Sequence, residues 1–219
     1  MPTPTNNIIL PPRLFATVGY YAQIAAAASV VVDTSLRYDK RHKSVHRYDI
    51  ADTRGRLSLT VPIVKPHECE GHPTWADVGI STHGEWWRLH LTALESAYGR
   101  TPYFEFIIDK FSDIFTNPEQ ADAATDILDL TCRADKIVRH ILMINTPTEW
   151  RPIGPDDLQI YTRSNSFSSS EMITYYQIRA NQLGFIHSLS VLDLIFNLGP
   201  EATLYIDEMA RGLQTQTSF

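Results

Sequence analysis

The feature that most constrains the fold is a succession of three segments near the amino terminus. Ile8–Leu10 and Ser29–Asp33 (SVVVD) have the apolar composition of short strands, and residues 16–28 between them have a helical pattern. Strand, helix and strand in this order are typical of a βαβ unit, in which the two strands are parallel. Parallel strands leave a ligand crevice at their carboxyl ends. We therefore expect a crevice near Pro11–Arg13 and Asp33.

A β-hairpin is predicted next. Tyr48–Ala51 and Leu57–Ile63 alternate apolar with polar residues, and Asp52–Gly55 (DTRG) between them has the composition of a turn. Pro62 has no N–H group to donate, so it should end the second strand or lie at an edge.

The second half of the chain is predicted to be largely helical. Helical spacing begins near Gly84 and recurs over 104–115, 118–144, 171–184 and 188–199, after a short strand at 76–81. Residues 146–157 are rich in Pro and should form an exposed break, and 164–171 (SNSFSSSE) have the composition of a mobile loop. The predicted fold class is α/β, as an α+β mixture in one domain of 1–219: a strand–helix–strand unit and a hairpin followed by a largely helical carboxyl-terminal half.

Composition excludes several classes of protein. The chain has 219 residues, 43% of them hydrophobic, which is enough for a sizeable core. A formal net charge of −6 argues against general nucleic-acid binding, which needs a clustered excess of Lys and Arg. Two distant cysteines are typical of a reducing cytoplasm, and neither a signal peptide nor a membrane span is indicated. We expect a cytoplasmic protein.

One basic block interrupts this acidic chain. Seven Lys, Arg or His residues lie between Arg37 and Arg47. Lys40 and Arg47 are candidate ligands for a phosphate or carboxylate, with Tyr38 beside them, because a guanidinium group can bind two oxygens at once. The alternative is a solvated loop, the usual structure of a charge run.

Polar residues interrupt the apolar segment 188–199 (SLSVLDLIFNLG). Ser190 is predicted to cap the helix and Gly199 to end it. Asp193 and Asn197 then lie on one side of a buried helix, where they must be satisfied by buried partners or by a ligand. We expect both side chains to face inward, toward the basic block.

Aromatic residues and a histidine share one face of the helix that begins near Gly84. His90, between Trp87 and Tyr98, is a candidate general base because the ordinary pKa of histidine lies near neutrality. Tyr175 and Gln177 are candidates for binding sugar hydroxyls, together with Tyr98. Packing within an aromatic core is the alternative for the whole group.

Metal and cofactor signals are weak. His67, Cys69 and His72 lie close together, but their spacing matches no standard zinc motif, so no metal site is predicted. The sequence has no P-loop, GxSxG, GxGxxG or paired CxxC motif. The cofactor is therefore unknown.

Several separated motifs together resemble the WbqC-like protein family. The residues that carry the resemblance are Gly19-Tyr20-Tyr21, Tyr38-x-Lys40, His46-Arg47 with Ile50, Leu59–Pro62, Trp87 with His90 and Tyr98, Tyr175–Gln177, Gly184-Phe185 and Ser188–Gly199. This sequence departs from the family pattern at His46 and at His187-Ser188, where members often have Asn and Pro-Asn.

The resemblance implies a cytoplasmic transferase in the synthesis of bacterial O-antigen or other surface-polysaccharide precursors. Glycyl transfer to a nucleotide-linked sugar is the reaction that it suggests. From their residue types and positions, we expect His90 and Asp193 to be the catalytic residues. The alternative is a non-catalytic module that binds a ligand or a partner protein. A pocket that gathers the separated motifs would favour the enzyme, whereas a flat exposed patch would favour the module.

Overall fold

The computed structural model describes residues 6–65, 72–163 and 173–216. The strands are β1 (Asn7–Leu10), β2 (Ser29–Asp33), β3 (Arg47–Asp52), β4 (Gly55–Thr60), β5 (Ile63–Val64), β6 (Gly79–Ile80), β7 (Thr148–Arg151) and β8 (Thr162–Arg163). The helices are α1 (Val18–Ala26), α2 (Trp86–Tyr98), α3 (Phe104–Ile108), α4 (Ile127–Ile141), α5 (Asp157–Ile160), α6 (Ala180–Leu183), α7 (Val191–Leu198) and α8 (Ala202–Gln216). The predicted α/β mixture is confirmed.

A four-stranded parallel sheet has the order β7-β2-β1-β8. The βαβ prediction is confirmed, because β1 pairs with β2 in parallel, from Asn7 opposite Ser29 to Leu10 opposite Val32. The chain adds β7 beside β2 and then crosses back to add β8 beside β1. The direction of strand addition therefore reverses next to β1.

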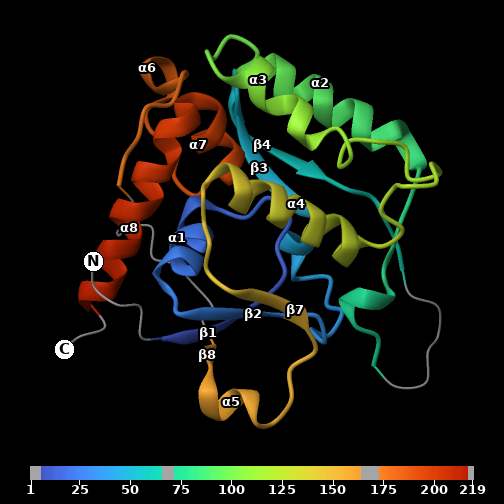
Figure 1. Cartoon of the computed structure of the whole chain (residues 1–219). Helices are drawn as coiled ribbons and strands as arrows, with labels where there is room; N and C mark the ends of the chain where they lie inside the picture. Colours follow the sequence, from blue (N-terminus) through green and yellow to red (C-terminus); the bar gives the residue numbers. More distant parts are fainter. Residues whose placement is uncertain (1–5, 66–71, 164–172, 217–219) are drawn as a thin grey trace.

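Helices cover the parallel sheet mainly on one side. In Figure 1, α1, α4 and α8 lie on that side and the short α5 lies on the other. Helix α1 packs against α8, near the carboxyl end of the described chain. The central strand β2, which has a neighbouring strand on each side, is buried along Val30–Asp33.

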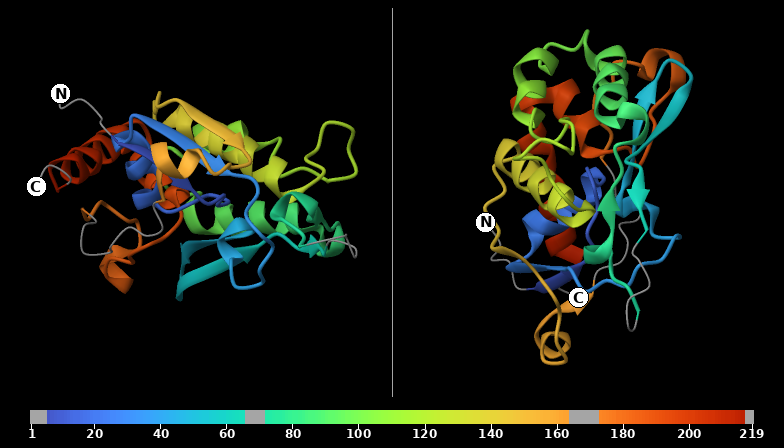
Figure 2. Two further views of the ribbon diagram at one scale, coloured as in Figure 1. Left: turned by 90° about the horizontal axis from the view of Figure 1, so that it is seen from below. Right: turned by 90° about the vertical axis from the view of Figure 1, so that its right-hand side faces the viewer.

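The predicted hairpin is also confirmed. Strands β3 and β4 pair antiparallel from Arg47 opposite Thr60 to Asp52 opposite Gly55. Alternation of side chains puts Tyr48 and Ile50 into the core, where α2 packs on β3. Figure 2 shows the hairpin, α2 and α3 at the end of the molecule opposite the parallel sheet.

Three sequence-based boundaries were wrong. The helix predicted for 118–144 begins only at α4, because Asp126 caps it by accepting a hydrogen bond from the Asp129 N–H group. The Pro-rich segment 146–157 contains strand β7, which pairs with β2, and it is followed by the short strand β8, which pairs with β1. Of the helix predicted for 171–184, the described part is helical only over Ala180–Leu183.

Helix α7 has the ends that were predicted. The Ser190 hydroxyl accepts a hydrogen bond from the Leu192 N–H group, and Gly199 ends the helix with a φ of 53°. The Asp193 carboxylate, three residues after the cap, accepts hydrogen bonds from other elements of the fold and so does not bond back to the Ser190 N–H group. Every residue of α7 is buried. Within the described ranges, no helix has the length and apolar character needed to cross a membrane.

Candidate functional site

A crevice lies at the carboxyl ends of β1 and β2, where the sequence predicted one. Its volume is about 450 Å³. It is lined by Ile9, Pro11, Pro12, Arg13, Asp33, Leu36, Arg41, His42, Ser44 and Val45. The lining thus comes from three segments: the end of β1 with the loop after it, the end of β2 with Leu36, and part of the basic block.

Backbone and side-chain contacts fix the walls of the crevice. The Leu14 N–H group donates to the Ser44 carbonyl at 3.0 Å, which joins the β1 loop to the basic block. The Tyr20 hydroxyl of α1 donates to the Pro11 carbonyl at 3.1 Å, and the Arg13 guanidinium lies 5.9 Å from the centre of the Tyr20 ring. At the end of β2, the buried Asp33 carboxylate accepts a hydrogen bond from the Ser35 N–H group at 2.9 Å.

The structure brings part of the basic block to the crevice. Arg41 and His42 line it, whereas Lys40 is exposed and Arg47 is half-buried on β3, and neither of these two lines the crevice. Arg41 is held by Asp39, whose carboxylate accepts from the Arg41 Nη2 at 2.6 Å. The hydrogen bonds from Arg41 lower the pKa of Asp39 to about 2.

Arg47 and Tyr38 contact other parts of the protein. The Arg47 Nε donates to the Thr60 hydroxyl at 2.8 Å, across the hairpin. The Tyr38 ring packs edge-on against the buried Trp75 ring, with 4.9 Å between the ring centres. Both residues therefore stabilise the fold around the basic block.

His90 lies in a buried aromatic cluster. Its Nδ1 is 3.1 Å from the Tyr48 hydroxyl, and its ring packs edge-on against Trp86 and Phe115. Only 3% of His90 is exposed. Burial lowers the pKa of His90 to about 4, against a weaker opposing effect of a hydrogen bond to the Thr60 backbone. The imidazole is therefore neutral near pH 7 and lies away from the crevice lining.

This burial predicts a pH dependence of stability. The pKa of His90 is about 4 in the folded chain and near its ordinary value of 6.5 in the unfolded chain. Below pH 6.5 the unfolded chain therefore binds a proton that the folded chain does not, and the free energy of unfolding falls as the pH falls from 6.5 toward 4. Between about pH 7 and pH 5, we expect the free energy of unfolding to fall by about 1–2 kcal/mol less in His90→Gln than in the wild type. Urea unfolding at both pH values measures this difference.

The control is His140→Gln on the exposed side of α4. It should leave the pH dependence of the wild type unchanged. An equal pH dependence in the wild type and His90→Gln would contradict the prediction.

Asp193 is the centre of a buried hydrogen-bond network. The Tyr98 hydroxyl donates to its Oδ1 at 2.8 Å, and the Tyr175 hydroxyl and Gln177 Nε2 donate to its Oδ2 at 2.7 and 2.9 Å. Asp193 is 1% exposed, and it forms no ion pair with any described residue. Burial raises its pKa, and the three donors oppose this effect. The carboxylate is thus satisfied by neutral donors.

Asn197 extends this network to the backbone. Its Nδ2 donates to the Asp193 carbonyl at 2.7 Å, and its Oδ1 accepts from the Ile178 N–H group at 2.8 Å. The Gln177 side chain is in turn bonded to both backbone groups of Ile186. Both side chains face inward, as expected, but the direction toward the basic block was wrong, because their partners come from α2 and from the segment 175–186.

The candidate residues thus fall into separate groups. Tyr98, Tyr175, Gln177, Asp193 and Asn197 meet in the buried network, while His90 belongs to the aromatic cluster near Trp87.

Selection by residue type missed three crevice residues. Arg41, His42 and Ser44 line the crevice but were not chosen as candidates, whereas Arg13 was expected beside it. The signal that could have found them was position, because they follow the carboxyl ends of parallel strands in the chain or lie within the basic block.

Most of the cluster His67, Cys69 and His72 lies outside the described residues. His67 and Cys69 lie outside them, and only His72 of that group is described. Within the described part of the chain, no group of three or more His, Cys, Asp or Glu side chains is arranged to hold a metal ion.

Comparison with known proteins identifies the family. The model of the WbqC-like protein family matches residues 12–154, which include the crevice loop, the basic block and the hairpin. The match ends before Tyr175, Asp193 and Asn197, on which part of the resemblance rested. No curated protein and no solved structure matches the chain. Because the family model covers more than half of the sequence, the chain belongs to the WbqC-like protein family.

Proposed function

We propose that this protein is a cytoplasmic transferase in the synthesis of a bacterial surface-polysaccharide precursor such as O-antigen, and that it binds a nucleotide-linked sugar in the crevice. Glycine is the group that we propose it transfers. The observation that carries the proposal is the position of the crevice at the carboxyl ends of parallel strands, next to the point where strand addition reverses. Open α/β sheets bind their ligands at such a point.

The sheet order supports a nucleotide ligand. The four strands stand in the order third, second, first and fourth along the chain, as in the first part of a doubly wound dinucleotide-binding sheet. In that fold an acidic residue at the end of the second strand binds the ribose hydroxyls. Asp33 occupies this position and lines the crevice. We therefore propose that Asp33 binds the ribose.

Arginine side chains replace a glycine-rich phosphate loop. The loop after β1 reads Pro-Pro-Arg, so close approach of the backbone to a diphosphate, which glycines permit, is not available here. Arg13 in the loop after β1 and Arg41 in the basic block both line the crevice, and Arg41 is also bonded to Asp39. Guanidinium groups form paired hydrogen bonds with phosphate oxygens. We propose that they bind the diphosphate, with the exposed Lys40 adding positive charge nearby.

The proposed site can be tested by calorimetric titration with UDP and UDP-N-acetylglucosamine. Arg13→Gln should weaken binding about 10- to 100-fold, the equivalent of one charge-assisted contact of about 1–3 kcal/mol. The matched control is Arg211→Gln, which removes an exposed arginine of α8 and should leave affinity unchanged. Equal affinity of the wild type and Arg13→Gln, or no binding by the wild type, would remove the crevice from consideration.

One observation favours the non-catalytic alternative. His90 and Asp193, the residues expected to move protons, are buried and lie outside the crevice lining. A binding module would bind the nucleotide-linked sugar without turnover. Mass spectrometry of the sugar after incubation with glycine and ATP separates the two functions, because only the transferase adds the mass of a glycyl group.

A further inference from the structure

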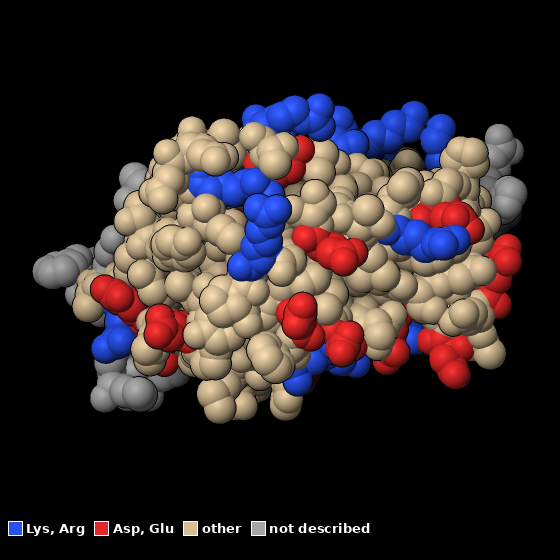
Figure 3. All heavy atoms as spheres, turned by 90° about the horizontal axis from the view of Figure 1, so that it is seen from above, with Lys and Arg blue, Asp and Glu red and all other residues tan. Residues whose placement is uncertain are grey.

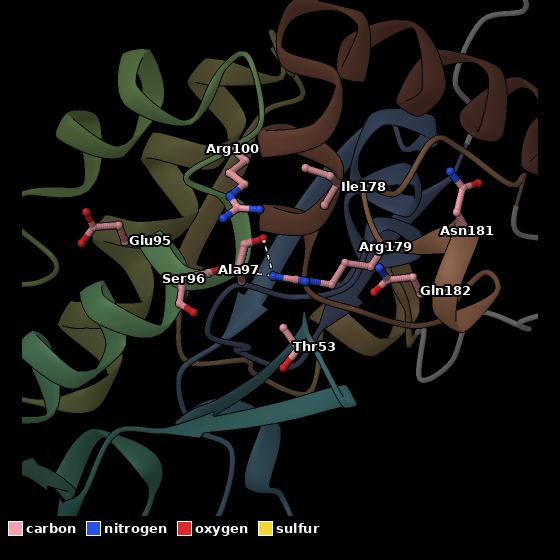
Figure 4. Close-up of a pocket in the computed structure, with 9 residues that line it drawn as sticks. All are labelled: Thr53, Glu95, Ser96, Ala97, Arg100, Ile178, Arg179, Asn181 and Gln182. Carbon is pink, nitrogen blue, oxygen red and sulfur yellow. Dashed lines mark hydrogen bonds between the residues drawn. The ribbon is translucent and has the colours of Figure 1, made fainter.

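A second cavity lies at the opposite end of the molecule from the parallel sheet. It has a volume of about 590 Å³ and lies between the carboxyl end of α2, the turn of the β3–β4 hairpin and the segment 178–182 (Figure 4). Its lining residues are Thr53, Glu95, Ser96, Ala97, Arg100, Ile178, Arg179, Asn181 and Gln182. The proposed transferase function does not use this cavity.

Arg179 is held in place at the wall of the cavity. Its Nη2 donates to the carbonyls of Ser96 and Ala97, at 3.1 and 3.4 Å. These carbonyls belong to the last turn of α2, where a helix carries about half a negative charge. The two bonds use one of the three guanidinium nitrogens, and Nε has no hydrogen-bond partner among the described residues. The Arg179 guanidinium is therefore held in position without all of its N–H groups being used in the hydrogen bonds to α2.

Arg100 brings a second positive charge to the same cavity. It is exposed and forms no ion pair with any described residue. In Figure 4 the side chains of Arg100 and Arg179 run toward the end of α2 from different directions, while that of Glu95 points away from them. Two full positive charges exceed the single negative charge of Glu95, which also lines the cavity, together with the partial negative charge of the helix end. The wall of the cavity therefore has a small excess of positive charge.

The wider face carries charges of both signs. Figure 3 views the face that carries α2, α3 and α6, on which Lys and Arg side chains are more numerous toward the upper edge and Asp and Glu side chains toward the lower edge. Side chains of each kind occur in both halves, so the charge that favours an anion is the local one of Arg100 and Arg179.

The buried network positions the arginine-bearing segment. Gln177 is bonded to Asp193, and the Ile178 N–H group donates to Asn197 at 2.8 Å. The next residue along the chain is Arg179, which bonds to the end of α2. Tyr98 of α2 donates to Asp193 in turn. The network thus connects the segment that carries Arg179 to α2, which ends two residues before Arg100, so the Arg179 guanidinium is arranged before any ligand arrives.

Most of the remaining lining residues are polar. Ser96 and Thr53 offer hydroxyl groups, Asn181 and Gln182 are amide residues, and only Ala97 and Ile178 are apolar. Such side chains are suited to hydrogen-bond a ligand that carries several hydroxyl groups. We propose that this cavity binds an oxyanion carried on a hydroxyl-rich body, namely a sugar phosphate or a sugar acid, through Arg100 and Arg179.

The experiment is a titration of the whole protein with four probes, followed by NMR and calorimetry. Glucose 6-phosphate and glucuronate carry both features, glucose lacks the anion, and inorganic phosphate lacks the hydroxyl-rich body. We expect one or both of the first two to bind more tightly than glucose and inorganic phosphate. Arg100→Gln and Arg179→Lys should each weaken that binding about tenfold or more, because neither substitute keeps the guanidinium fork. Preference for one of the two probes identifies the anion as a phosphate or as a carboxylate.

Two controls separate this site from other effects. Arg88→Gln removes an exposed arginine from the first half of α2 and should leave binding unchanged. Arg13→Gln changes only the crevice and should also leave it unchanged, so the test is independent of the proposed transferase function. Arg100 is exposed, so its replacement should not alter the melting temperature.

Three results would overturn the proposal. They are no binding of glucose 6-phosphate or glucuronate by the wild type, unchanged binding in Arg100→Gln, and an equal loss of binding in Arg88→Gln or Arg13→Gln.

Discussion

Asp193→Ala is expected to lower the free energy of unfolding by about 3–5 kcal/mol. The substitution leaves Tyr98, Tyr175 and Gln177 without the acceptor that they share, in a region where the carboxylate is 1% exposed. Each buried donor without a partner costs about 1–3 kcal/mol, and relaxation of the two hydroxyl groups recovers part of this. Urea unfolding followed by circular dichroism measures the loss.

The matched control is Asp207→Ala, an exposed aspartate of α8 that should change the free energy of unfolding by less than about 0.5 kcal/mol. Asp193→Asn should fall between the two, because an amide keeps one acceptor oxygen but presents an N–H group to the Gln177 donor. A loss below about 1 kcal/mol in Asp193→Ala would show that the network does not stabilise the fold.

Gly199→Ala is expected to destabilise the protein by about 3 kcal/mol or more. Gly199 has a positive φ of 53°, a conformation that side chains disfavour, and a Cβ atom there would lie 2.4 Å from the ring of Tyr103. Both the backbone and the ring would have to move. Thermal and urea unfolding should report the same loss.

The glycine of α8 provides the opposite case. Gly212 lies within a helix, and a Cβ atom there would contact nothing within 4 Å. Gly212→Ala should therefore stabilise the chain by about 0.5–1 kcal/mol. If Gly199→Ala and Gly212→Ala had equal effects on stability, neither the positive φ of Gly199 nor its closeness to Tyr103 would explain the glycine at position 199.

Local pattern was enough to predict the elements whose residues repeat with a regular period. The unit β1–α1–β2 and the hairpin β3–β4 were found because alternation and short apolar runs are properties of the segments themselves. Strand β7 was missed because it lies among prolines and gains its pairing from β2. The segment around Tyr175 was wrongly predicted as a helix, since its side chains bind Asp193 in a different conformation.

The position of the crevice was predicted better than the residues that line it. The rule for parallel strands located the crevice at Pro11–Arg13 and Asp33. Lys40 and Arg47 were chosen because of their charge, but which members of a basic block line a crevice depends on how the loop folds back. The network of Asp193 joins segments far apart in the chain, and nothing in one sequence indicates such a pairing.

The order of strand addition also bears on how the chain folds during synthesis. Strand β2 cannot pair with β7 until residues 34–147 between them have been synthesised. Strand β1 can pair with β8 only after β8 has emerged from the ribosome. Helix α1 remains uncovered until α8, near the end of the chain, can pack on it. Pairings between distant segments form slowly, and unpaired strand edges favour aggregation in the meantime. We therefore expect the amino-terminal third of this protein to be the part that lacks its packing partners for longest while translation continues.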